Sequence, residues 1–246
     1  FTMVSCDDFL STDSKSTFTE QSAFSNLDFA TKAVNGIYAN LTHNDLYERE
    51  LLYFACDNDI ELVPSINNGR NRDISHYEAN SGNQVLKNVW DLLYQTIERA
   101  NICIDHLPVS LIWEGDYAVE ARQLYGEAVT LRALCYSLLI SSWGDVPFVV
   151  KPTMGEDDLY LPKTDRDSIY EYLVQDLENV EDYIPWKNAS LSAERINKGF
   201  VKGLRARIAL AYAGYSLRNK TFEIKRGRHW EEYYRIANQE CREIIE

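Results

Sequence analysis

The sequence predicts a mainly α-helical fold: an α-solenoid or bundle of tetratricopeptide-like paired helices, with long irregular loops that face a ligand. Apolar residues recur at helical spacing over most of the chain. Pro or Gly follows several of these periodic segments, as is typical of helix ends. One long segment, residues 56–84, has no such period and is rich in Asn, Asp, Ser, Gly and Arg. No strict register of about 34 residues holds, so any repeat is degenerate.

Three helices are predicted in the first part of the chain, at 26–41, 88–107 and 116–142. The third has the clearest apolar stripe, with alternating spacings of four and three residues: Tyr117, Ala121, Leu124, Ala128, Leu131, Cys135 and Leu138. Pro108 stops the second helix, and Gly144 caps the third just ahead of Pro147.

Three more helices are predicted at 165–184, 197–217 and about 229–246. Asp165 or Thr164 is the expected N-cap of the first of these, and Pro185 closes it. No capping signal is found at Glu246. We therefore interpret the chain as truncated or cleaved within a larger protein.

Composition limits the classes of function. Apolar residues make up 45% and charged residues 26% of the 246 residues, which is the profile of a globular protein with a core. No run of about 18 apolar residues predicts a membrane-spanning helix. The net charge of −13 argues against nucleic-acid partners, which need a basic surface. Of the five cysteines, none forms a CxxC pair, and Cys103 and Cys135 lie among apolar residues as buried free thiols do.

No motif predicts an enzyme. The four histidines are scattered, and HExxH, GxSxG and a phosphate-binding loop are all missing from the sequence. A pair of carboxylates acting as a glycosidase is the alternative. The acids lie mostly on predicted exposed helix faces, however, where solvation is the ordinary explanation.

No cofactor or metal is predicted, although one segment resembles part of a calcium loop. Asp57, Asp59 and Glu61 alternate as the ligands of such a loop do. Leu62 stands where a Gly is expected, and no bidentate Glu closes a loop of about 12 residues. A structural Ca²⁺ is thus an alternative to a solvated turn, which the sequence favours.

Five segments carry a resemblance to one family. In chain order they are "CDDFL" with "FATKAVNGIYANL", "VWDLLYQTIERANICIDHL", "GEAVTLRALCYSLLISSWGDVPFV", "RDSIYEYLVQDLENVEDYIP" and "NKGFVKGLRARIALAYAGY". Together they resemble the SusD-like (RagB/SusD) glycan-binding lipoproteins of the Bacteroidetes outer membrane. Trp143 stands where Phe or Tyr is expected, Arg207 and Ile208 match more loosely, and the family's C-terminal half is not found.

The resemblance implies a function in nutrient uptake. A SusD-like protein captures an oligosaccharide or polysaccharide at the cell surface and hands it to a SusC-like TonB-dependent transporter, over which it acts as a lid. The helices are then expected to contact the transporter barrel while the loops face the glycan. The alternative is an interaction module of the same fold that binds peptide or protein without binding glycan, and a glycoside hydrolase is a third hypothesis.

The first residues resemble the end of a lipoprotein signal. Val4 and Ser5 fit the small-residue box before an acylated cysteine, here Cys6, while Met3 replaces the usual Leu. From the local sequence alone, a free cysteine in a tail is an equal alternative. With the resemblance, we expect a signal-peptide remnant, a lipidated tether on the outer membrane and a helical domain, at residues 1–5, 6–25 and 26–246.

The irregular segment 56–84 is the predicted ligand site. Sugar hydroxyls donate and accept hydrogen bonds, and amides, carboxylates and guanidinium groups match them. The candidates for such bonds are Asp57, Asn58, Arg70, Arg72, Asn80 and Asn83. His76 and Tyr77 are candidates for stacking on a pyranose ring. The alternative is that Asn, Asp and Gly simply form turns here.

Other aromatic residues could also serve as sugar platforms. Those at predicted helix ends or in loops are Trp113, Tyr117, Tyr160, Trp186 and Trp230. Such residues more often act as staples or plugs between helices. Trp90 and Trp143 lie on helix stripes, so both are predicted to be core. The basic segment 218–228 is interpreted as a solvated loop or a contact with an acidic partner.

Overall fold

The computed structural model describes residues 24–55, 60–61, 64–65, 69–154, 160–187 and 195–246. The predicted lipidation site Cys6 and the candidate ligand residues Asp57 and Asn58 lie outside these ranges. The predicted tether and signal remnant therefore stay predictions.

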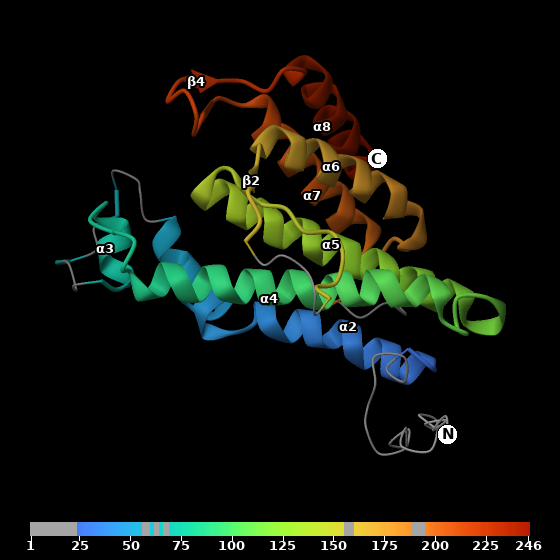
Figure 1. Ribbon diagram of the computed structural model, residues 1–246. Helices are drawn as coiled ribbons and strands as arrows, with labels where there is room; N and C mark the ends of the chain where they lie inside the picture. The colour runs from blue at the N-terminus through green and yellow to red at the C-terminus, as the bar shows by residue number, and fades with distance from the viewer. Residues whose placement is uncertain (1–23, 56–59, 62–63, 66–68, 155–159, 188–194) are drawn as a thin grey trace, which may run out of the picture.

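The described chain is mainly helical, which confirms the predicted fold class. The six predicted helices are α2 (Leu27–Leu41), α4 (Gln84–His106), α5 (Ala118–Trp143), α6 (Arg166–Val180), α7 (Lys198–Ala213) and α8 (Trp230–Ile245). Helix α2 packs on α4 and α5, α5 packs on α4 and α6, and α7 packs on α6 and α8. The helices thus stack largely in chain order, with α2 and α4 at one side and α8 at the other, and α5 contacts both α2 and α4 (Figure 1).

Short elements connect the long helices. They are the π-helical turn η2 (Asn44–Glu48), the 3-10 turns η3 (Glu50–Phe54), η4 (Leu107–Val109), η5 (Gly115–Tyr117) and η6 (Glu181–Tyr183), and the five-residue helix α3 (Asn71–Ser75). Two antiparallel pairs of short strands complete the set: β1 (Val146–Pro147) with β2 (Lys163–Thr164), and β3 (Ser216–Leu217) with β4 (Ile224–Lys225).

Polar side chains fix where the helices begin. Asn26, Asp165 and Asn197 each accept a hydrogen bond from a backbone N–H in the first turn of α2, α6 and α7, at 3.0–3.1 Å. Of the two predicted caps of α6, Asp165 is therefore the one used. Gly144 caps α5 directly after Trp143, as predicted, because its φ of 74° suits glycine and a Cβ added there would meet Asn219 at 2.9 Å.

Some predicted boundaries were wrong by a few residues. Helix α4 begins at Gln84 rather than at 88, because Asn83 caps it there. Helix α6 ends at Val180, and η6 replaces its predicted last turn before Pro185. Helix α7 ends at Ala213, because the chain turns at Gly214 and enters β3. The first part of the predicted basic loop 218–228 therefore forms the turn of the β3–β4 hairpin and its second strand, β4.

The centre of the fold is α5, which is buried over most of its length. Arg132 on α5 is 2% exposed and donates to Asn101 Oδ1 at 2.9 Å and Asp176 Oδ2 at 2.7 Å. The predicted buried free thiols Cys103 and Cys135 are confirmed, and burial raises the pKa of each to about 12. At neutral pH both are therefore protonated and unreactive packing groups.

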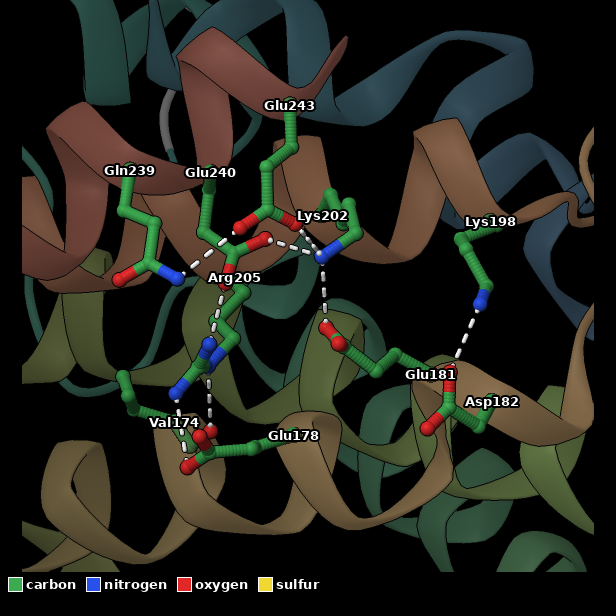
Figure 2. Close-up of polar contacts among 10 residues, drawn as sticks. All are labelled: Val174, Glu178, Glu181, Asp182, Lys198, Lys202, Arg205, Gln239, Glu240 and Glu243. Atoms are coloured by element: carbon green, nitrogen blue, oxygen red, sulfur yellow. Dashed lines mark hydrogen bonds and ion pairs between the residues drawn. The ribbon is translucent and has the colours of Figure 1, made fainter.

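Charged side chains attach α8 to its neighbours. Lys202 on α7 is 3% exposed, and its Nζ lies 3.0 Å from Glu181 Oε2, 3.1 Å from Glu240 Oε2 and 2.7 Å from Glu243 Oε2. Figure 2 shows the ammonium group at the meeting point of these three carboxylates. One turn away, Lys198 pairs with the exposed Asp182 at 2.8 Å.

Arg205 extends this cluster toward α6. Its Nε donates to the carbonyl of Val174 at 3.0 Å, Nη2 lies 2.8 Å from Glu178 Oε2, and Nη1 pairs with Glu240 (Figure 2). Glu240 is 1% exposed, and its two carboxylate oxygens pair with the two buried cations, Lys202 and Arg205. Each charge in the cluster thus has an opposite charge beside it, as burial requires.

Within the residues described, no helix has both the length and the apolar character needed to cross a bilayer.

Candidate functional site

The predicted ligand segment is built around the short helix α3. Ser75 Oγ donates to the carbonyl of Tyr53 at 3.2 Å, and Asn71 Nδ2 donates to Glu50 Oε2 at 3.2 Å, which docks α3 on η3. The buried carboxylate of Asp73 accepts from the backbone N–H of Gly69. Sequence periodicity could not detect α3, because five residues are too few to show a helical repeat. These bonds give the segment a fixed place at the N-terminal end of α4 (Figure 1).

Asn83 is a buried residue that supports the backbone of this site. It is 1% exposed, and its Oδ1 accepts from the backbone N–H groups of Val85 at 3.0 Å and Leu86 at 3.1 Å. Its Nδ2 donates to the carbonyl of Arg70 at 2.9 Å. The amide therefore caps α4 and holds the backbone of Arg70, while the Arg70 side chain is exposed. A direct bond from Asn83 to a ligand stays a prediction.

Two further candidates also bond locally. Arg72 Nη1 donates to the carbonyl of Pro64 at 3.2 Å and contacts Ser65 Oγ at 3.4 Å. Asn80 Oδ1 accepts from the backbone N–H of Gly82 at 2.8 Å. The Asn80 contact is of the turn-forming kind that the sequence leaves as the alternative to ligand binding, whereas the Arg72 contact joins α3 to residues 64 and 65. The side chain of Asn80 itself stays exposed.

Tyr77 is the most prominent of the candidates. Its side chain is 78% exposed, and its backbone has a φ of 60°, which is rare for a bulky residue. Hydrogen bonds from Tyr77 N to Ile74 O at 3.1 Å and from Glu78 N to Asp73 O at 2.9 Å maintain this turn. Strained backbone held by its surroundings is characteristic of functional sites. The turn places the ring in solvent directly after His76, which is half-buried at the end of α3.

A row of aromatic rings continues from this site into the helices. Ring centroids are 5.9 Å apart for Phe54 and Trp143, 5.3 Å for Trp143 and Trp90, 4.9 Å for Trp90 and Tyr94, and 6.4 Å for Tyr94 and Tyr136. The prediction that Trp90 and Trp143 are core is corrected, because both are half-buried and pack against the core from its edge.

A groove of about 700 Å³ lies beside this row, between α4 and the segment that follows β1. Its lining residues are Trp90, Tyr94, Asp105, Pro147, Val149, Lys151, Pro152, Thr153, Met154, Tyr160 and Leu161. Tyr94 OH donates to the carbonyl of Pro147 at 2.7 Å, and burial raises its pKa, so the hydroxyl stays protonated. Of this lining, only Tyr160 was named from the sequence as a possible sugar platform, and the groove itself was missed. A further local signal is the i,i+4 pair of Trp90 and Tyr94 on α4.

A second hollow, of about 690 Å³, lies among α2, α5 and α7. Two of its polar lining residues are paired with Glu127: Tyr38 OH donates to Glu127 Oε2 at 2.9 Å, and Arg195 Nη2 lies 2.6 Å from the same oxygen. Burial, followed by the charge of Glu127, raises the pKa of Tyr38. With these groups already paired, the hollow has less polar chemistry to offer a ligand.

The aromatics at predicted helix ends divide into two kinds. Trp113 packs edge-on to Tyr125 at 5.5 Å, and Arg226 lies 4.4 Å over Trp230. These two tryptophans therefore pack between neighbouring elements. Tyr160 is 93%, Tyr117 53% and Trp186 46% exposed. Among the described residues, no cluster of three or more His, Cys, Asp or Glu side chains could hold a metal ion. Of the calcium-like trio, Asp57 and Asp59 are outside the described residues.

Comparisons with known proteins agree with one another. A family model described as "starch-binding associating with outer membrane" matches residues 8–210. SusD-like protein P25 of Formosa agariphila is 27% identical over 195 residues, which cover 75% of this chain and 36% of that protein. The chain thus spans about a third of the length of this curated relative.

Solved structures share the fold. A SusD homolog from Bacteroides thetaiotaomicron has a TM-score of 0.76 at 21% identity, over 92% of this chain and 42% of that one. Surface glycan-binding protein A from Bacteroides uniformis has a TM-score of 0.70 at 19% identity, over 90% of this chain and 46% of that one. At these identities the likeness concerns the fold.

Proposed function

The chain belongs to the SusD-like family, and from this premise we propose that it captures oligosaccharide or polysaccharide at the cell surface and delivers it to a SusC-like TonB-dependent transporter. The observation that carries the proposal is the family match over residues 8–210. A fold neighbour that is by name a surface glycan-binding protein supports the same class of ligand. The action is recognition, without cleavage of a glycosidic bond.

The α3 segment supplies the chemistry for this recognition. The exposed ring of Tyr77 offers a flat apolar face of the kind that packs on the C–H face of a pyranose. The Arg70 guanidinium donates several hydrogen bonds, and the His76 imidazole donates or accepts one, to hydroxyls at the ring edge. Because bonds to Glu50 and Asn83 hold α3 and the backbone of Arg70 in place, little ordering of these residues has to accompany binding.

Attachment to the membrane forms part of the proposal. Cys6 would carry the lipid and the following residues the tether to the helical domain. One acyl chain gives only marginal membrane binding, at about 0.8 kcal/mol per buried CH₂, so stable anchoring requires more than one chain. Incorporation of radiolabelled palmitate into the wild type and its loss in Cys6→Ala is the expected result. Label that persists in Cys6→Ala would contradict this assignment.

The test of glycan capture is affinity electrophoresis of the full chain in gels that contain starch, laminarin or xyloglucan, three glucans that differ in linkage. Retardation by at least one glucan is expected. Tyr77→Ala should weaken that binding about tenfold, which corresponds to about 1.4 kcal/mol of lost stacking. Tyr234→Ala is the matched control, since Tyr234 is also an exposed tyrosine, 36% exposed, but lies on α8, which packs on α7 at the other side of the helical stack from α4.

Three other results would change the assignment. Binding of peptides but of no glucan would favour the interaction module. Release of reducing sugar from a bound glucan would indicate a hydrolase. Co-purification of the transporter equally well with an unrelated outer-membrane lipoprotein would remove the support for delivery to that partner.

A further inference from the structure

We propose that the groove beside α4 is a second glycan-binding subsite, which prolongs the α3 site along the helix, so that the protein selects chains of several sugars over single sugars. This inference rests on the proposed glycan capture. It adds where a longer glycan makes its second contact, which that function leaves open.

The groove has the size and lining of a ligand site. Its volume of about 700 Å³ falls within the range of about 300–1,000 Å³ that small-molecule sites occupy. Trp90, Tyr94 and Tyr160 provide aromatic surface, while Asp105 and Lys151 add one acceptor and one donor group of opposite charge. Such a mixture suits a neutral polyol, which presents apolar ring faces together with hydroxyls that donate and accept.

Helix α4 places this groove in line with the α3 segment. Asn83, Trp90 and Tyr94 are separated by seven and four residues, which puts all three on one side of the helix. At 1.5 Å per residue, Asn83 lies about 16 Å along the axis from Tyr94. Asn83 holds Arg70 of the α3 segment through its Nδ2, at 2.9 Å. The backbone of Arg70 and the aromatic lining of the groove are therefore both positioned by residues on one side of a single continuous helix.

Hydrogen bonds hold the described part of the groove wall at residues 149–153 in place before any ligand binds. Tyr136 OH donates to the carbonyl of Val149 at 2.8 Å and accepts from its N–H at 2.7 Å. Asn101 Nδ2 donates to the carbonyls of Val149 at 3.3 Å and Lys151 at 3.1 Å. The N–H of Thr153 donates to Glu98 Oε1 at 2.8 Å. A preformed wall lowers the entropic cost of binding, and so favours a ligand site over an incidental gap.

The hollow among α2, α5 and α7 makes a useful contrast. It has nearly the same volume, about 690 Å³, but its Tyr38 and Arg195 are already bonded to Glu127. It also has no comparable link to the α3 segment through the side chains described. The groove beside α4 combines open aromatic surface with continuity to the proposed site, and for that reason we assign the subsite there.

The test is isothermal titration of the full chain with a length series of oligosaccharides, from two to about eight sugars, cut from whichever glucan retards the wild type. Wild-type affinity should rise with length and then level off. Tyr160→Ala should weaken binding of the longest oligosaccharide about tenfold and leave the shortest unchanged. Because Tyr160 is 93% exposed, this substitution removes little packing.

Two more variants complete the design. Trp90→Phe keeps a ring against Trp143 but shortens the platform, and should reduce the length dependence in the same way. Tyr77→Ala should weaken the binding of short and long ligands alike, and Tyr234→Ala should weaken the binding of neither. If Tyr160→Ala and Trp90→Phe bind every length as the wild type does while Tyr77→Ala loses binding, glycan capture stands and the second subsite is overturned. If the wild type binds no glucan, the proposed function itself has failed.

Discussion

The helix pairs α4–α5 and α7–α8 are both closely packed, but different chemistry holds each together. In the first pair the buried side chains are mostly apolar, and Leu93, Ile97 and Leu139 are each no more than 1% exposed. In the second, α8 buries only Tyr233, Ala237 and Glu240. A charged residue is thus one of the three groups by which α8 is anchored.

The difference matters because the two kinds of contact fail differently. An apolar side chain is stabilised by leaving water, at about 25 cal/mol per Å², whichever apolar partner receives it. A buried charge is tolerated only while its partner is present, since desolvation is otherwise uncompensated. The α7–α8 pair therefore depends on a complete set of charges, whereas the α4–α5 pair depends on filled volume.

The largest expected effect is that of Glu240→Ala. It leaves Lys202 and Arg205 buried without their shared carboxylate, and should lower the free energy of unfolding by about 3–5 kcal/mol. Urea unfolding measures the total, and hydrogen exchange should show protection lost first in α8. A loss below about 1 kcal/mol, the value of a surface ion pair, would mean that the cations remain solvated and that the contrast between the pairs is wrong.

A smaller or equal effect is expected for Leu139→Ala in α5. Removing buried methyl groups should cost about 2–5 kcal/mol, according to how far the surroundings collapse. Here exchange protection should fall across α4 and α5 together, because no single helix is anchored by that residue. Selective release of α5 alone would argue against a shared apolar core.

The effect of pH on the free energy of unfolding should be smaller still, and confined to the charged α7–α8 pair. The hydrogen bond from Lys202, and then that from Gln239, lowers the pKa of Glu243 below 4.5. The carboxylate therefore contributes stability above about pH 4.5, which is lost as the pH falls through the lowered value. Burial alone would lower the pKa of Lys202, but bonds to Glu243, Glu181 and Glu240 outweigh it and raise the pKa, so its contribution is lost only as the pH rises past about 10.5.

Urea unfolding of the wild type and Glu243→Gln between pH 6 and pH 3 checks the acid limb of this prediction. The wild type should lose more stability over that range than the variant does. Parallel curves would show that Glu243 contributes nothing through its charge.

The smallest effect is expected for Lys198→Ala, one turn before Lys202 on α7. Its partner Asp182 is 88% exposed, so water replaces the ion pair at little cost. The urea midpoint should not move measurably. A shift like that of Glu240→Ala would mean that position on α7, and not burial, decides the value of a charge.

The helices could be predicted because their signal is local. Apolar spacing and caps such as Asp165 and Gly144 place each long helix within a few residues of its observed ends. The local sequence could not show which polar residues are buried. Lys202 and Glu240 have the spacing of an ordinary solvated face, and only the approach of α7 to α8 encloses them.

The candidate site shows the same limit. The irregular segment was recognisable from its composition, and Tyr77 and Arg70 do lie exposed on it. Asn83 looked like any other amide of the segment, although its bonds to Val85, Leu86 and Arg70 make it the cap of α4. Trp90 was predicted as core from its helix stripe, because periodicity gives the face of a residue but not the depth of its burial.

The side chain of Arg226 has a consequence for how this end of the molecule opens. Its guanidinium lies 4.6 Å over Tyr215, which precedes β3, and 4.4 Å over Trp230 and 5.8 Å over Tyr234, which belong to α8. A hairpin with two residue pairs is marginally stable at best in water by itself. Arg226 links the hairpin to α8, so opening either one breaks cation–π contacts that also stabilise the other, each worth about 0.5–2 kcal/mol. We therefore expect that loosening α8 also loosens the hairpin.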